Sequence, residues 1–290
     1  MKIKKMFLWL LVFPVLVNAQ IKGVVKDSIS GKPIQYVSIL IENKNIGATT
    51  DEFGRFEIEK YDKNQDKLLF NILGYKLKKV SNGNTNEVLL TPISILLNEV
   101  KIAKKPKKKL KTIRIGNAHK TLNMWFTAPN PVLYCKKFDY EDKFIKTPYL
   151  KEVIVYARSD SAKATFKVKI FAYDTIKKIP SKSLLDEEII ATALPGENKI
   201  IVDVSKLYIE IPKEGIVVGV ETILCKENLI VSKRGNTYGP GFYINRNNKN
   251  SFAYLNFEWI DLTEHKIDNS KGELKVYMTK EPCINLTLSN

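Results

Sequence analysis

The stretch GATTDEFGRFEI, residues 47–58, holds a tight turn and the start of a strand, and it decides the fold class of the first part of the chain. Residues 51–54 are predicted to form the turn, because Gly54 can adopt a positive φ at little cost. Arg55–Ile58 then alternates polar and apolar side chains, as a half-buried strand does. We interpret the Asp51 carboxylate as an Asx-type cap of the turn; a Ca²⁺ ligand is the alternative.

Turn formers and apolar runs alternate on both sides of this stretch. Short runs rich in β-branched residues, bounded by Gly, Pro, Asn and Asp, are typical of strands. Strands are predicted at residues 21–27, 36–41, 55–58, 67–72 and 88–90, with a turn at residues 28–33 (SISGKP).

The order I-x-G-x-V-x-D, G-x-P-I-x-x-V-S-I, G-A-T-T-D-x-x-G-R-F-x-I and G-Y-K resembles the carboxypeptidase-regulatory-like domain, also called carboxypeptidase D regulatory-like or transthyretin-like. This domain is common in exported proteins of Bacteroidetes. The resemblance covers residues 21–102 and implies a seven-stranded, prealbumin-like Greek-key sandwich. In peptidases such a module accompanies the catalytic domain and does not itself cut peptides. The matching residues are Gly23, Asp27, Gly31, Pro33, Val37, Thr50, Asp51, Gly54, Phe56, Gly74 and Tyr75.

Residues 1–19 have the pattern of a secretory signal peptide. Three lysines precede the apolar run at residues 6–17, and Ala19 ends it with a small residue suited to cleavage. The run is shorter than the roughly 20 residues that a spanning helix needs. An uncleaved N-terminal anchor is the alternative. We expect an exported protein, in the periplasm, on the outer-membrane surface or secreted, with no transmembrane segment after cleavage.

The chain of 290 residues carries a formal net charge of +16, and its lysines are spread along the whole sequence. Most of them fall on the polar phase of predicted strands. We therefore interpret the basicity as a solvated surface and expect no nucleic-acid partner. Residues 103–112 are predicted to be an extended basic linker, because like charges repel and little there can be buried. Peripheral attachment to an anionic surface through Lys104–Lys111 is the alternative.

Residues 113–290 are predicted to form a second antiparallel β-sandwich that is jelly-roll-like. Residues 165–170 (TFKVKI) alternate cleanly, with Phe166, Val168 and Ile170 on one face. Many short strands without long helices between them favour this architecture, and the whole chain is expected to be all-β. Residues 184–190 fit a short strand or a helical turn. Further strands are predicted at residues 151–157, 199–204, 215–223, 241–245, 252–261 and 273–278.

Aromatic side chains beside planar polar groups are the candidate ligand-binding residues, because such rings stack on the apolar faces of sugars. The loop at residues 234–241 (RGNTYGPG) is rich in turn formers and is predicted to display Tyr238 at a rim. Burial in the core is the alternative for each ring, and we favour it for Trp259, which shares a strand phase with Leu255 and Phe257. The candidates are Tyr238, Tyr243, Arg234, Asn236 and Trp125.

Three cysteines, Cys135, Cys225 and Cys283, have a spacing that matches no metal-binding pattern. A Cys135–Cys225 disulfide in an oxidising compartment and buried free thiols both remain open. The two histidines, His119 and His265, form no H-x-x-E or H-E-x-x-H motif, and no serine lies in G-x-S-x-G.

We therefore expect no metal, no cofactor and no catalytic residue. The predicted function is that of an exported, non-catalytic binding or scaffold protein of the cell envelope, whose partner is a protein or a glycan. A carbohydrate-active hydrolase, or its carbohydrate-binding accessory protein, is the alternative, since two distant carboxylates would suffice for glycoside hydrolysis. Adjacent acids such as residues 186–188 are interpreted as solvated.

Overall fold

The computed structural model describes residues 20–44, 46–59, 61–62, 64–81, 85–93, 110–116, 125–160, 163–233, 235–245, 250–255, 258–262 and 281–290. The predicted signal peptide (residues 1–19), most of the predicted linker, both histidines, Arg234 and the strand predicted at residues 273–278 lie outside the described residues.

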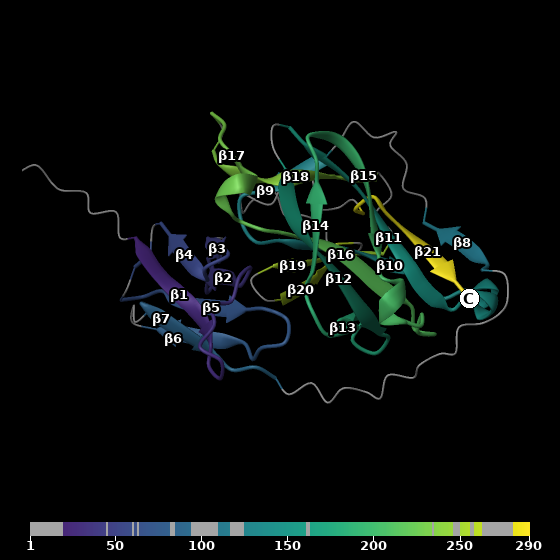
Figure 1. Ribbon diagram of the computed structural model, residues 1–290, viewed down its shortest axis with the longest axis horizontal. Coiled ribbons are helices and arrows are strands. Elements are labelled where there is room, and N and C mark those ends of the chain that lie inside the picture. Colours follow the sequence, from purple (N-terminus) through teal and green to yellow (C-terminus); the bar gives the residue numbers. More distant parts are fainter. Residues whose placement is uncertain are drawn as a thin grey trace, which may run out of the picture.

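The first domain is a sandwich of two small sheets, shown in purple and blue in Figure 1. One sheet has the strand order β4-β1-β7 and the other β3-β2-β5-β6, so the seven strands implied by the resemblance are present. All pairs are antiparallel except β1 with β7. The strands are β1 (Ile21–Asp27), β2 (Ser38–Ile41), β3 (Gly47–Thr49), β4 (Arg55–Ile58), β5 (Lys67–Asn71), β6 (Lys78–Ser81) and β7 (Glu87–Leu90).

The core of this domain joins its two sheets through the apolar phase of each strand. Phe56 on β4 packs edge-on against Phe70 on β5, with ring centroids 5.5 Å apart. The predicted turn before β4 is confirmed: Gly54 has φ +71°, and the Asp51 carboxylate accepts hydrogen bonds from the backbone N–H groups of Phe53 and Arg55. The Asx-type cap predicted for Asp51 therefore holds β4 in place.

The second domain contains two larger sheets, and every strand pair in their ladders is antiparallel. Its strands are β8 (Thr112–Ile115), β9 (Trp125–Ala128), β10 (Leu133–Phe138), β11 (Tyr149–Ser159), β12 (Ala164–Asp174), β13 (Ile179–Ser183), β14 (Ile189–Ala193), β15 (Gly196–Asp203), β16 (Ile216–Thr222), β17 (Leu229–Ile230), β18 (Thr237–Tyr243), β19 (Ser251–Leu255), β20 (Glu258–Asp261) and β21 (Ile284–Ser289).

One sheet runs β13-β12-β16-β10-β19-β20, with β14 also on β12; the other runs β17-β18-β11-β21-β8, with β15 on β11 and β9 on β18. The predicted face of β12 is confirmed, because Phe166, Val168 and Ile170 are each 0% exposed and lie in the core between the sheets. The C-terminal strand β21 pairs with both β11 and β8, so it ties the two ends of this domain together. The second β-sandwich is therefore present.

Two details differ from the prediction. Residues 184–188 are bends and irregular backbone that lead into β14, rather than a strand or a helical turn. The single strand predicted at residues 252–261 is instead the hairpin of β19 and β20, in which Tyr254 lies opposite Trp259. The phase argument that placed Trp259 in the core assumed an unbroken strand, and a two-residue connection resets that phase.

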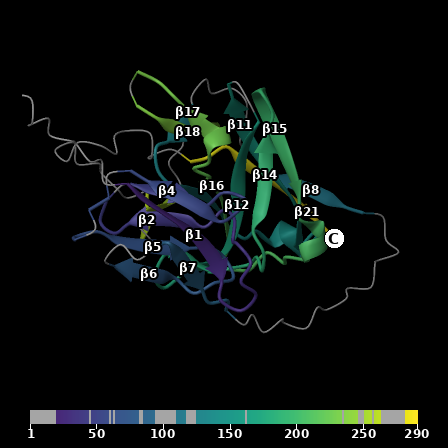
Figure 2. The same ribbon diagram turned by 60° about the vertical axis from the view of Figure 1, so that its left-hand side comes forward.

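Helical structure in the described part of the chain is limited to three 3₁₀ turns: η1 (Asp142–Lys146), η2 (Ser205–Leu207) and η3 (Lys226–Asn228). Within that part, no helix has the length and apolar character needed to cross a bilayer. The two sandwiches lie side by side in both views (Figures 1 and 2). The first domain packs on the outer face of the β12–β16 sheet, and hydrogen bonds join Ser38 to Glu221 and Leu73 to Glu188 across that boundary.

Candidate functional site

The outer face of the β12–β16 sheet carries charged side chains that the first domain covers. Lys167 and Lys169 occupy the polar phase of β12, and Glu221 lies opposite Lys167 on β16. Lys167 is only 1% exposed and Lys169 only 9%. The prediction that the lysines form a solvated surface is therefore wrong for these two, because a second sandwich takes the place of water on this face.

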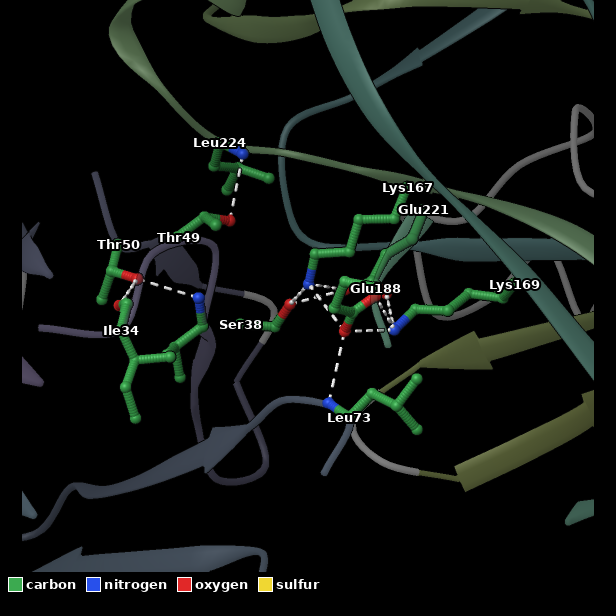
Figure 3. Close-up of polar contacts among 11 residues, drawn as sticks. Ile34, Ser38, Thr49, Thr50, Leu73, Lys167, Lys169, Glu188, Glu221 and Leu224 are labelled. Carbon is green, nitrogen blue, oxygen red and sulfur yellow. Dashed lines mark hydrogen bonds and ion pairs between the residues drawn. The ribbon is translucent and has the colours of Figure 1, made fainter. Parts of the chain in front are cut away.

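A hydrogen-bonded ion network crosses the boundary at this point, as Figure 3 shows. Ser38 of β2 donates its hydroxyl hydrogen to Glu221 Oε1 at 2.5 Å and accepts a hydrogen bond from Lys167 Nζ at 3.2 Å. Lys167 Nζ also lies 3.2 Å from Glu221 Oε1. One hydroxyl of the first domain thus bonds to both members of an ion pair in the second.

Glu188 extends this network. Lys169 Nζ donates to both of its oxygens, at 2.6 and 2.7 Å, and lies 3.5 Å from Glu221 Oε2. The backbone N–H of Leu73, in the first domain, donates to Glu188 Oε1 at 3.2 Å. The interpretation of residues 186–188 as solvated acids is therefore wrong for Glu188. Because two lysines face two glutamates, the buried network has no net charge, and its members compensate one another.

Electrostatic interactions favour the charged forms of Glu221 and Lys169. Burial by itself would raise the pKa of Glu221, but the charges of Lys167 and Lys169 and the hydrogen bond from Ser38 lower it to about 2. Burial likewise opposes the charged form of Lys169, and the carboxylates of Glu221 and Glu188 raise its pKa above the usual value. The two opposite charges of Glu221 and Lys169 thus stabilise each other inside the boundary.

A second contact between the domains lies at β3. The Thr49 hydroxyl accepts a hydrogen bond from the backbone N–H of Leu224 at 3.1 Å (Figure 3). Gly47 is needed for the same close approach, since a Cβ there would lie 2.4 Å from the Ile39 carbonyl oxygen and 3.0 Å from Pro131 Cδ. Beside this contact a cleft of about 1030 Å³ opens between the two domains.

Among the described residues, charges of both signs line this cleft in equal number. Its cations are Lys22, Arg55, Lys163 and Lys226, and its anions are Asp51, Glu52, Glu57 and Glu227. A lining of this kind does not select for strongly charged ligands. It suits a ligand that is polar and close to neutral overall.

The first domain presents two strand edges to the cleft. β3 and β4 are terminal strands of their sheets, and residues of both line the cleft. The hydrogen bond from Val25 N to the Gly54 carbonyl sets the β1–β4 ladder, so the backbone groups of Arg55 and Glu57 point away from β1. Those of Arg55 bond to Asp51. The Glu57 N–H and C=O therefore lie on the outer edge of β4, with which no further strand of the described chain pairs.

Two tyrosines also line the cleft, one from each domain. Tyr36 has φ +60°, a left-handed conformation that is costly for a tyrosine, and its hydroxyl interacts with Thr165 across the boundary. Burial raises the pKa of Tyr238, and the charge of Glu59 in the first domain adds to the shift. Tyr238 is thus a half-buried side chain that faces the first domain.

The sequence-predicted ligand residues fall in two places. Tyr238 lines the cleft, and exposed Asn236 lies just before β18. Tyr243, at the far end of β18, pairs with Trp125 on β9, and their ring centroids are 6.1 Å apart. The Arg158 guanidinium covers the Trp125 ring at 4.8 Å. The structure therefore separates Tyr238 from the Trp125–Tyr243 pair, and Arg234 lies outside the described residues.

The cysteines are free thiols. Cys135 lies opposite Gly219 in the β10–β16 ladder, whereas Cys225 follows the end of β16. Gly219 and Thr222 are three strand positions apart, or roughly 10 Å, which exceeds the Cα separation that a disulfide can bridge. The Cys135–Cys225 disulfide is therefore not formed, and the alternative of unpaired thiols describes the structure. Cys225 lines the cleft.

Most of the boundary residues were missed by sequence reasoning. Ser38 lies in the V-S-I part of the family pattern but was given no role there, and Lys167, Lys169, Glu188 and Glu221 carry no motif and look like ordinary polar positions of a strand or loop. The alternation of β12 did mark Lys167 and Lys169 as outward-facing, which is correct, but nothing local shows that another domain covers that face. Within the described ranges, no cluster of three or more His, Cys, Asp or Glu side chains could hold a metal ion.

The chain is therefore an all-β protein of two β-sandwiches, which meet at a polar boundary with a cleft beside it. Residues 21–102 match the family model described as "CarboxypepD_reg-like domain", so the first domain is a carboxypeptidase-regulatory-like domain. No curated protein matches the chain.

Two solved structures show a distant likeness. One is the clostridial cysteine protease Cwp84 after propeptide cleavage, at 12% identity and a TM-score of 0.39, covering 88% of this chain and 66% of that one. The other holds the cysteine protease and lectin-like domains of Cwp84, a surface layer associated protein of Clostridium difficile. It has 13% identity and a TM-score of 0.35, covering 88% of this chain and 59% of that one. Likenesses at this level carry no functional argument.

Proposed function

We propose that this chain is an exported, non-catalytic binding protein that takes an extended polypeptide segment of a partner in the cleft between its two domains. The observation that supports this most is the unpaired edge of β4 beside the cleft. An extended peptide gains affinity by adding its main-chain hydrogen bonds to such an edge, and specificity from the side-chain contacts around it.

The dimensions and chemistry of the cleft fit this function. Its volume of about 1030 Å³ lies at the upper end of ordinary ligand sites, as a polymer segment requires. The Glu57 N–H and C=O supply one donor and one acceptor on the free edge, and Tyr36 and Tyr238 supply rings against which side chains can pack. Because the charges on the walls balance, specificity for a peptide segment would come from its shape and hydrogen bonds rather than from its net charge.

The proposal is tested with the chain lacking residues 1–19 and a display library of random linear peptides. We expect selected peptides to bind the wild-type chain and to lose about tenfold in affinity with Glu57→Pro, which removes the edge donor. Proline is tolerated at an edge position whose N–H faces outward, so the variant should fold. Glu57→Ala is the matched control, since it removes the side chain but keeps the N–H.

Two results would overturn this function. One is a set of selected peptides that bind Glu57→Pro and wild type equally. The other is specific binding on a glycan array that is lost in Tyr238→Ala, which would assign the same cleft to carbohydrate. Tyr238 would contact either a peptide or a glycan in the cleft, so the comparison of Glu57→Pro with wild type decides between these two ligands.

A further inference from the structure

A second, smaller cavity lies between the domains, where the ion network reaches its wall. Its volume is about 300 Å³. The first domain contributes Ser38, Asn71 and residues 72–75, and the second contributes side chains from β12, β13, β16, β19 and β20. The cavity shares none of its lining residues with the larger cleft.

Three aromatic rings form one wall of this cavity. Trp259 lies 4.8 Å from Tyr254 and 5.3 Å from Phe171, measured between ring centroids. All three rings are half-buried and pack against the cluster that contains Cys135 and Val217. The hairpin turn between β19 and β20 places Trp259 here, since Tyr254 is its partner in the ladder. The wall therefore offers an apolar, polarisable surface to whatever enters.

Among the residues that the structure describes, Lys169 and Glu221 are the only charged ones in the lining, and their charged atoms lie 3.5 Å apart. Because each already compensates the other, the cavity has no net charge to offer an ionic ligand. Polar groups complete the lining: the Asn71 amide, together with the hydroxyls of Ser181 and Ser183. The Asn71 amide forms no hydrogen bond with any part of the chain that the structure describes, so it is free to bind a ligand.

We propose that this cavity binds a single neutral sugar ring. A sugar ring has an apolar face and an edge of hydroxyl groups. The apolar face would pack on the aromatic wall, and the hydroxyl groups would bond to the amide, hydroxyl and compensated charged groups of the lining. The cavity volume admits one sugar ring rather than a chain of them. The ring would contact Trp259 in one domain and Asn71 in the other. Binding therefore stabilises the association of the two domains, because the ligand recognises only their joined form.

The experiment uses the fluorescence of Trp259. Trp125→Phe leaves Trp259 as the only indole in residues 20–290. That variant is titrated with uncharged monosaccharides (glucose, galactose, mannose and N-acetylglucosamine) up to about 20 mM, a range set by the millimolar affinity expected of so small a ligand. We expect saturable quenching or enhancement with at least one sugar, and a rise of the unfolding temperature with the same sugar.

Matched variants locate the binding. Ser181→Phe, at an exposed position on the rim, should abolish the titration by filling the cavity. Lys182→Phe changes the next residue on β13, which is exposed and does not line the cavity, and should leave the titration unchanged. The inference is overturned if no sugar changes the emission, or if Ser181→Phe and Lys182→Phe behave alike. Glu57→Pro should leave this titration intact, so failure of the peptide function and failure of the sugar site are told apart.

Discussion

At the scale of single residues, the buried ion pair of Lys167 and Glu221 gives the clearest expectation for stability. A buried ion pair is weak evidence for stability, since the loss of hydration offsets much of the attraction between the charges. Removal of one partner is another matter, because it leaves the other charge buried without compensation. Here Lys167 and Lys169 would share a single remaining carboxylate, that of Glu188.

Glu221→Gln is therefore expected to lower the free energy of unfolding by about 3 kcal/mol. Urea denaturation at neutral pH measures it. Lys22→Ala serves as the control, since the Lys22–Glu57 pair is exposed by 61% and 49% and its loss should cost less than about 1 kcal/mol. Adding Lys167→Met to Glu221→Gln should restore part of the loss. Equal effects of Glu221→Gln and Lys22→Ala would contradict the role given to the network.

Asp27 makes stability depend on acid pH. Its carboxylate accepts hydrogen bonds from the backbone N–H groups of Ser30 and Ile29, and from the hydroxyls of Ser30 and Tyr75. These bonds, led by that of the Ser30 N–H, lower its pKa from 3.8 to about 2. A lowered folded-state pKa means that the contribution to stability is complete above the unfolded pKa and is lost as pH falls through the folded one.

We expect Asp27→Asn to flatten the pH dependence of unfolding between pH 3.8 and about 2, while leaving the profile above that window parallel to wild type. Urea midpoints measured at pH steps from 2 to 6 test this. A variant profile that keeps the wild-type slope between the two pKa values would show that another group is responsible.

At the scale of elements, the turn before β4 aligns the strand whose edge faces the cleft. Gly54 combines φ +71° with a crowded site, where a Cβ would lie 2.5 Å from the Val25 carbonyl oxygen. Gly31 has a similar φ of +68°, but a Cβ added there would have no atom within 4 Å. Substitution of Gly31 therefore tests the cost of the left-handed backbone alone, whereas substitution of Gly54 tests that cost together with a steric clash.

Gly31→Ala is expected to cost about 1 kcal/mol through the left-handed conformation alone. Gly54→Ala should cost at least about 2 kcal/mol, because a carbonyl of β1 must move as well. Denaturant unfolding compares them directly. If Gly54→Ala proves no worse than Gly31→Ala, then the contact with β1 adjusts freely and the turn does not set the position of β4.

At the scale of the whole molecule, the two sandwiches are joined by hydrogen bonds to buried charged and backbone groups rather than by apolar contacts alone. The first domain supplies the Ser38 hydroxyl, the Thr49 hydroxyl and the Leu73 N–H. Each such hydrogen bond contributes a net of about 0.5–1.5 kcal/mol, and about 1.5–3 kcal/mol where the partner is charged. Separation of the domains would lose several of them at once, so we expect the domains to unfold together.

Scanning calorimetry of the wild type should give one transition with equal calorimetric and van't Hoff enthalpies. Ser38→Ala combined with Thr49→Val removes three hydrogen bonds across the boundary without touching either core, and should broaden or split that transition. Ser28→Ala, an exposed hydroxyl of the first domain, is the control and should leave it unchanged. Two transitions in the wild type would contradict the coupling.

By itself, the sequence determined the all-β class, the capped turn at Asp51 and the buried face of β12. These features follow from local rules: Asp and Gly specify a turn, and period-two alternation divides a strand into two faces. The seven strands of the first domain were implied by the family resemblance, since the local pattern predicted strands only at residues 21–27, 36–41, 55–58, 67–72 and 88–90. The pairing of β19 with β20 was beyond those local rules, because the alternation of Leu255, Phe257 and Trp259 continues without a turn signal in the sequence.

Only the tertiary structure decided whether water or another domain covers the outer face of each sheet. Lys167, Lys169 and Glu221 are polar by every local measure, yet another domain buries them, and Ser38 of that domain is 129 residues from Lys167 in sequence. Alternation shows which side of a strand is turned from its own core, but not whether water or another domain lies there. The cleft, the smaller cavity and the separation of Tyr238 from Trp125 all follow from that docking, which depends on the complementarity of two folded surfaces.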